Sequence, residues 1–196
     1  TQSRAILECN GDYSVTELEP MEHRRFTSNE TTKAGRFSVA GKSNHIRCEV
    51  RGDKIRVTIN DEEVIAYDGD QRRLGRSPNA IVRDERVLYL GAFNREITYH
   101  AIKLTPIKGE AKLLRDASGQ ESDPDAPTDL TTKDRDIDLL AHVDVDADAV
   151  VGEWKFDGGN LVTPSGPGQV LRLPCKPPRD YCLDIELTRV KGTGEL

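Results

Sequence analysis

Two carboxylates stand two positions apart in the strand-like run 181–190, namely Asp184 and Glu186. Residues i and i+2 of a strand share a face, so both acids would point the same way. Two carboxylates on one face are what general acid/base cleavage of a glycosidic bond requires. No third acid extends this pair along the strand, so we expect Asp184 and Glu186 to be carboxylates that face solvent. We keep both as candidates for ligand binding and assign no catalytic residue.

Three further acids alternate at Asp144, Asp146 and Asp148, as calcium ligands sometimes do. An EF-hand loop counted from Asp144 would need Gly at its sixth position and Glu at its twelfth. Those positions hold Ala149 and Lys155. We therefore expect an exposed acidic turn, no metal site and no cofactor, with a looser calcium site as the alternative.

The four cysteines, Cys9, Cys48, Cys175 and Cys182, form no Cys-x-x-Cys pair, which argues against a zinc site. Cys175 and Cys182 flank the turn 176–180, where a cross-strand disulfide is the alternative to free thiols. Cys48 lies on the apolar phase of its strand and is expected to be a small core residue. The cysteines do not decide between a reducing and an oxidising compartment, and we favour an extracytoplasmic location.

Trp154 is the only tryptophan. It would be exposed as a platform for a sugar and buried as an anchor of the core, and we keep Trp154 as a binding candidate. The sequence has four histidines, which lie too far apart to suggest a set of metal ligands: His23, His45, His100 and His142. No Ser, Cys or Lys lies in a motif that would mark it as a nucleophile.

The elements that must position these residues are clearest between residues 46 and 67. Apolar and polar residues alternate there, interrupted by turn residues at 51–54 and 60–62. Such alternation predicts consecutive antiparallel hairpins with one buried face. Arg51-Gly52-Asp53 matches an adhesion tripeptide, but Gly-Asp is also what a tight turn requires, and we interpret it as a turn.

Composition supports a sheet protein. Of 196 residues 36% are hydrophobic and only 5% aromatic, so the core must rest on Val, Ile and Leu. The net charge is −6 and no basic stripe is interleaved with aromatics, which excludes a typical nucleic-acid interface. No apolar run approaches the roughly 20 residues that cross a bilayer, so we expect no membrane insertion.

The chain divides into three parts. Residues 1–107 consist of strands and turns, and residues 134–196 form a second strand-rich unit. The segment 108–133 is rich in Asp, Glu, Lys, Pro, Ser and Thr, and we expect a disordered linker there. Because the first residue is Thr1 and residue 196 follows a strand without a closing turn, we interpret the sequence as an excerpt of a longer protein.

Residues 43–70 and 86–107 resemble the late strands of concanavalin A-like (laminin-G-like) sandwiches, most closely the 3-keto-disaccharide hydrolase-type domain common in planctomycete-like bacteria. Residues 152–196, with a Trp strand and a Gly-Gly turn, resemble the opening strands of that domain. This resemblance implies that Trp154 is a buried anchor of the core. One departure is Gly-Thr-Gly at 192–194, where the family often has Asn-Ser-Gly. The closing portion therefore precedes the opening portion, as in an excerpt of a tandem array.

The resemblance implies an all-β fold, an antiparallel two-sheet jelly-roll-like sandwich with its halves in permuted order. Residues 1–107 would be the C-terminal portion of one repeat, and residues 134–196 the N-terminal portion of the next, docked on the first. The implied function is a non-catalytic binding module for a glycan or protein ligand within a larger multidomain bacterial protein. The alternative is a glycoside-type hydrolase acting on a 3-keto-disaccharide.

Overall fold

The structure is a computed structural model that describes residues 4–9, 15–19, 21, 29–74, 84, 86–115 and 136–192. Antiparallel strands dominate it, and the all-β class expected from the sequence is confirmed. The predicted hairpin run is present: β4 (Ser43–Arg51), β5 (Lys54–Ile59) and β6 (Glu62–Asp68) follow one another through two tight turns, and β4 begins three residues before the expected residue 46. Within the described residues, no helix combines the length and the apolar character needed to cross a membrane.

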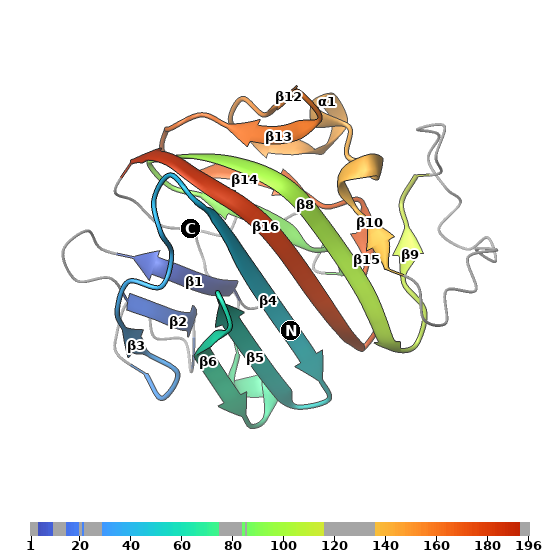
Figure 1. Cartoon of the computed structure of the whole chain (residues 1–196). Helices are drawn as coiled ribbons and strands as arrows, with labels where there is room; N and C mark the ends of the chain where they lie inside the picture. The colour runs from blue at the N-terminus through green and yellow to red at the C-terminus, as the bar shows by residue number, and fades with distance from the viewer. Residues whose placement is uncertain are drawn as a thin grey trace.

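An eight-stranded sheet forms one layer and faces the viewer in Figure 1. Its strand order is β12-β13-β8-β16-β4-β5-β6, and β10 pairs with β8 beside this path. The strands not yet given bounds are β8 (Arg95–Lys108), β10 (Ile137–Asp138), β12 (Lys155–Asp157), β13 (Asn160–Thr163) and β16 (Asp180–Gly192).

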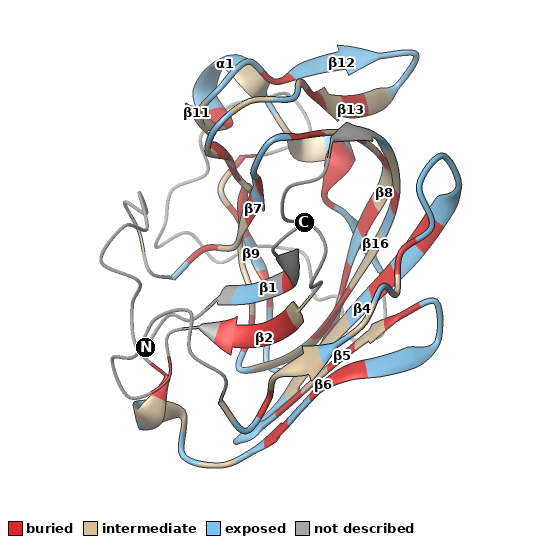
Figure 2. Cartoon of the chain, turned by 90° about the vertical axis from the view of Figure 1, so that its left-hand side faces the viewer, coloured by how far each residue is buried: buried red, intermediate tan, exposed pale blue. Residues whose placement is uncertain are grey.

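Three smaller sheets lie behind the large one and form the second layer (Figures 1 and 2). The first contains β1 (Arg4–Cys9), β2 (Val15–Glu19) and β3 (Lys33–Ala34). The second contains β11 (Ala149–Val151), β14 (Gln169–Arg172) and β7 (Tyr89–Ala92). The third pairs β15 (Cys175–Lys176) with β9 (Lys112–Leu113). The second layer is thus divided, where the sequence suggested one continuous sheet.

One apolar core lies between the layers, and alternation along the strands explains it. In β5, Ile55, Val57 and Ile59 are buried. In β6 the register shifts opposite Val57, and this irregularity lets Val64 and Ile65, which are adjacent, both be buried. The side of the large sheet that turns away from this core is called the outer face below.

The strand β16 joins the two separated portions of the sequence. It lies between β8 and β4 and pairs with both along most of its length. The second portion is therefore part of the same sheet as the first. That the two portions come from consecutive repeats stays a prediction.

The expected linker 108–133 begins too early. Residues 108–115 are placed: β9 pairs with β15, Ala111 and Leu113 are buried, and Arg115 is buried beside Asp148. Two apolar residues and one paired arginine are enough to anchor this stretch despite its polar composition. Residues 116–135 lie outside the described residues.

The sequence pattern also predicts a strand at 150–156 and a long loop at 71–85. The strand is divided into β11 and β12. The stretch 136–142 contains β10 and the short 3-10 helix η2 (Leu140–His142). A second 3-10 helix, η1 (Gln71–Arg73), lies within the stretch expected to be a loop. The one α-helix of the described residues, α1 (Val145–Asp148), is a single turn.

Candidate functional site

The outer face carries polar side chains at the point where β13, β8, β16 and β4 lie side by side. Asp184 of β16 is directly opposite Arg47 of β4, and Glu186 is opposite His45. The apolar phase of β16 points the other way, with Leu183 and Leu187 buried. The prediction that the two acids share a face with solvent agrees with this register, because Glu186 is exposed and Asp184 half-buried.

Asp184 is the centre of the contacts on this face. Its Oδ1 lies 3.0 Å from His45 Nε2 and 3.1 Å from Arg47 Nε, and its Oδ2 accepts from Arg47 Nη2 at 3.2 Å. Imidazole nitrogens donate only where they carry a proton, so the contact with a carboxylate places a hydrogen on Nε2 of His45. His45 Nδ1 makes no hydrogen bond within the described part of the chain, and the His45 side chain is 45% exposed.

Cys182 lies beside Arg47 on the same face. Arg47 Nε donates to its Sγ at 3.0 Å, and the thiol lies 3.5 Å from Asp184 Oδ2. Burial raises the pKa of Cys182, with a further rise from Asp184, and this outweighs the lowering by Arg47. The thiol is therefore protonated at neutral pH and lacks the thiolate character of a nucleophile.

Ser43 and Glu186 form the next contact along the face, since Ser43 Oγ donates to Glu186 Oε1 at 2.7 Å. Both residues are exposed. Neither contacts His45 through a side-chain hydrogen bond among the described residues, so no serine–histidine pair is assembled here.

His100 continues the contacts towards β13. Its Nδ1 lies 3.0 Å from Asn160 Oδ1, and its Nε2 lies 2.9 Å from Thr188 Oγ1. An amide oxygen only accepts, so Nδ1 donates to Asn160 Oδ1, and Nε2 lies within hydrogen-bond distance of the Thr188 hydroxyl.

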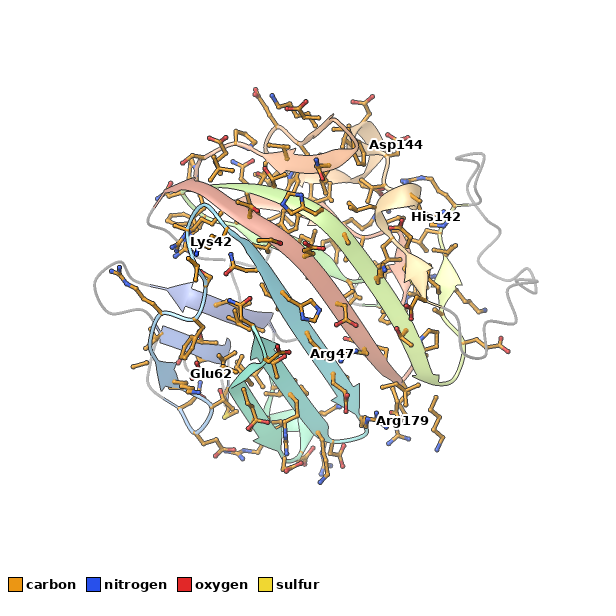
Figure 3. All side chains as sticks on the ribbon, viewed as in Figure 1. Lys42, Arg47, Glu62, His142, Asp144 and Arg179 are labelled. Carbon is orange, nitrogen blue, oxygen red and sulfur yellow. The ribbon has the colours of Figure 1, made fainter. Side chains whose placement is uncertain are left out.

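These contacts define a polar row across four adjacent strands. Its members are Asn160, His100, Thr188, Glu186, Ser43, His45, Asp184, Arg47 and Cys182. Arg47 is labelled on this face in Figure 3. The row can donate and accept hydrogen bonds from fixed positions, because regular strands hold every backbone segment that contributes to it.

Trp154 does not belong to this row. It is only 6% exposed, its ring centroid lies 6.0 Å from that of Tyr99 at 31°, and its Nε1 donates to Val151 O. The core interpretation of Trp154 agrees with these contacts. A sugar platform would need the indole face open to solvent.

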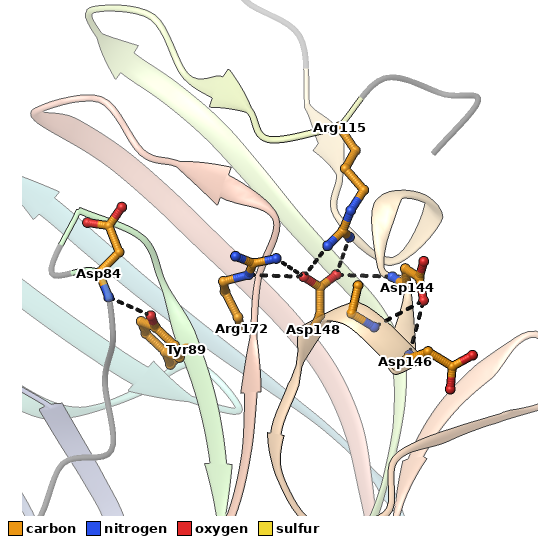
Figure 4. Close-up of polar contacts among 8 residues, drawn as sticks. Asp84, Tyr89, Arg115, Asp144, Asp146, Asp148 and Arg172 are labelled. Atoms are coloured by element: carbon orange, nitrogen blue, oxygen red, sulfur yellow. Dashed lines mark hydrogen bonds and ion pairs between the residues drawn. The ribbon is translucent and has the colours of Figure 1, made fainter. Parts of the chain in front are cut away.

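The acid triplet is built differently from the exposed turn that the sequence suggested. Asp144 caps α1 by accepting from the backbone of Asp146 and Ala147, whereas Asp148 is 1% exposed. Asp148 accepts from Arg115 at 2.5 and 2.8 Å and from Arg172 at 2.8 Å (Figure 4). Burial raises the pKa of Asp148, but bonds from the two arginines outweigh it, so the net shift is downward.

A calcium ion does not fit this triplet, because both oxygens of Asp148 already accept from arginines. Across the part of the chain that the structure covers, no group of three or more His, Cys, Asp and Glu side chains could hold a metal ion.

The cysteines and the Arg-Gly-Asp turn follow their simpler interpretations. Cys48, Cys175 and Cys182 are free thiols, so no disulfide joins the last two. Gly52 has a φ of 56°, which a tight turn requires, and its N–H donates to Asp180 Oδ1.

The sequence pointed to Asp184 and Glu186 but not to their partners. His45 and Arg47 occupy the polar phase of β4, so the alternation of the sequence did indicate that they face away from the core. Alternation could not predict that β4 and β16 are neighbours in the sheet, since β16 follows β4 by more than 100 residues. For His100 the sequence indicated only that it lies in a strand.

Comparisons with known proteins found no relative of this chain. No family model matches the chain, and neither a curated protein nor a solved structure matches it.

Proposed function

We propose that this chain is a non-catalytic binding module whose ligand lies on the polar row of the outer face. The observation that carries the proposal is the continuity of the row: hydrogen-bonding side chains from β13, β8, β16 and β4 meet on a face that no other element of the described residues covers (Figure 1). A hydroxyl-rich ligand needs such a set of fixed donors and acceptors.

The chemistry of the row supports binding more than catalysis. Cys182 is protonated, and Ser43 is bonded to Glu186 with no histidine beside it. Asp184 is shared between His45 and Arg47. The polar groups thus hold one another in position, as a pre-organised recognition surface does.

The ligand class follows from the resemblance of residues 43–70, 86–107 and 152–196 to concanavalin A-like sandwiches of the 3-keto-disaccharide hydrolase type. On that basis the ligand is a glycan, with a protein as the second choice, and the module is one repeat-derived unit of a larger bacterial protein.

Asp184→Asn tests the location of the site, with Asp157→Asn as the matched control on the exposed strand β12. A glycan array on the intact chain identifies the saccharide, and titration calorimetry measures its affinity. Loss of the charge that holds His45 and Arg47 should weaken binding about tenfold, as expected for a charge-assisted hydrogen bond. Asp157→Asn should not change the affinity, and an Asp184→Asn chain that binds normally would contradict the proposal.

A specific contact also favours a second function, hydrolysis of a 3-keto-disaccharide. Asp184 contacts Nε2 of the partly exposed His45, and Nδ1 has no hydrogen-bond partner among the described residues, which is the arrangement of a histidine general base. A release assay on 3-keto-disaccharides distinguishes the two functions. Suppose that the wild-type chain hydrolyses the substrate and that Asp184→Asn abolishes the activity without changing the thermal stability. The chain would then be an enzyme and not a binding module.

A further inference from the structure

A cluster of cations lies at the end of the sandwich where β8 ends and β16 begins, away from the polar row. We call it the basic patch, and it comprises Lys108, Lys112, Lys176 and Arg179. Figure 3 places Arg179 at the lower end of the large sheet and Lys42 at the upper end.

Strand pairing brings the members of the patch together. Lys112 of β9 is directly opposite Lys176 of β15, and Lys108 is opposite Asp180, the residue that follows Arg179. The neighbouring residues Leu113 and Cys175 are buried, so the alternate positions 112 and 176 point outward.

The facing lysines are unfavourable for the fold. Directly opposed side chains of an antiparallel pair have Cβ atoms about 5 Å apart, and like charges there are destabilising. Within the described residues Lys108, Lys112 and Lys176 form no ion pair within 4.0 Å, and Arg179 has only Asp180 at 3.9 Å.

Among the residues that the structure describes, the nearby acids do not cancel the positive charge of the cluster. Glu110 is exposed in the turn between Lys108 and Lys112. Asp84 is bound by Arg86, which with a smaller contribution from Lys176 lowers its pKa to about 2. The patch thus keeps an excess of positive charge on a chain whose net charge is −6.

We infer that the basic patch is a second binding surface, and that its ligand is an acidic polysaccharide. Flexible lysines of like charge attract a ligand that carries repeated anionic groups. A nucleic acid fits less well, because the neighbouring Ile107, Pro177 and Pro178 offer no aromatic face for bases. An acidic peptide adding a strand would need a longer edge than β9 or β15, which have two residues each.

Polygalacturonate, a saccharide with one carboxylate on each sugar, is the probe for the full chain. Binding should weaken steeply as salt rises, because the contacts are exposed and screened. Lys112→Gln and Lys176→Gln should each reduce the affinity about fivefold, the effect of one solvent-exposed charge contact. Lys42→Gln, at the far end of the sheet, should leave the affinity unchanged.

A stability measurement separates binding from a merely structural role. Because the two lysines repel each other, Lys112→Gln should raise Tm by about 1–3 °C while it weakens polygalacturonate binding. Asp184→Asn should have no effect on polygalacturonate binding. A negative result for the basic patch would therefore leave the function proposed for the polar row untouched.

Three results would overturn the inference. One is absence of polygalacturonate binding at low salt. Another is an equal loss of affinity in Lys42→Gln and Lys112→Gln. The third is binding of polyglutamate or polyadenylate at least as tight as that of polygalacturonate, which would assign the patch to a peptide or a nucleic acid.

Discussion

Asp148 is the buried charge on which most of the local structure around α1 depends. Its carboxylate accepts from Arg115, which follows β9, and from Arg172 of β14. Arg115 and Asp148 are almost fully buried, so neither charge can turn to water if the other is removed. Removing one member of such a group leaves the others uncompensated in a medium of low polarity.

Asp148→Asn should therefore lower the free energy of unfolding by about 3–5 kcal/mol, the usual effect of breaking a buried ion pair. Urea denaturation followed by the fluorescence of Trp154 measures the change. Asp146→Asn, two residues earlier and exposed, should change it by less than about 0.5 kcal/mol. Similar losses in both variants would show that the arginines contribute little.

The same group predicts a pH dependence. The pKa of Asp148 is lower in the folded chain than the roughly 3.9 of an unfolded aspartate. A depressed folded pKa contributes stability above the unfolded value, and this contribution disappears as pH falls through the folded pKa. The stability difference between the wild type and Asp148→Asn should be constant near pH 7 and shrink below about pH 4, as urea titrations at several pH values can measure.

Residue-scale prediction from the sequence succeeded where neighbours in the chain decide the environment. Cys48 lies on the apolar phase of β4 and packs against the core. Trp154, which the resemblance implied to be an anchor of the core, is part of it. Asp148 was misjudged because its partners are 24 and 33 residues away in sequence, and one of them, Arg115, lies within the polar stretch that suggested a linker. Burial of a charge depends on such distant partners, which local composition does not reveal.

At the scale of elements, the hairpins β4, β5 and β6 are the best-determined part of the chain. The turn between β5 and β6 has positive φ at both Asn60 and Asp61, as a type I′ turn requires. Asn60 also bonds to the carbonyl of Phe37. Asn-Gly is the preferred sequence for this turn, so Asp61 is the weaker of the two central residues.

Asp61→Gly should accordingly raise the free energy of unfolding by about 0.5 kcal/mol, because relief of the left-handed backbone outweighs the added freedom of glycine in the unfolded chain. A Tm higher by about 1–2 °C in calorimetry is the expected result. Asp53→Gly provides the control, since Asp53 has no positive φ and should gain nothing. A loss of stability in Asp61→Gly would show that the Asp61 side chain stabilises the turn.

Alternation predicted the centres of β4 to β6 and of β16, whose ends lie up to three residues further out, and it also predicted the phase of their side chains. It failed at 150–156, where Gly152 has a φ of 94° and separates β11 from β12. The candidate site needs β16 between β8 and β4, and this order is a property of the assembled sheet that no single strand encodes.

At the scale of the whole molecule, β16 makes the two portions of the sequence one cooperative unit. It is hydrogen-bonded to β8 on one side and to β4 on the other. Opening of β16 would expose Leu183 and Leu187 together with the facing residues of the core. We expect the two portions to unfold together.

Native-state hydrogen exchange tests this expectation. The amides of β16, β4 and β8 should exchange with one common free energy, equal to that of global unfolding, because none can open without the others. Amides of the edge strands β6 and β12 should exchange earlier and serve as the internal reference. Protection that persists in β4 after β16 has exchanged would show that the portions fold independently.

The position of β16 also has a consequence for synthesis on the ribosome. β8 ends at Lys108 and β16 begins at Asp180, so about 70 residues must be added before the gap between β8 and β4 can close. At 5–20 residues per second this takes about 4–14 s. During that interval two long hydrogen-bonding edges stay open to other nascent chains, which makes delayed closure the step at which a chaperone would be most useful.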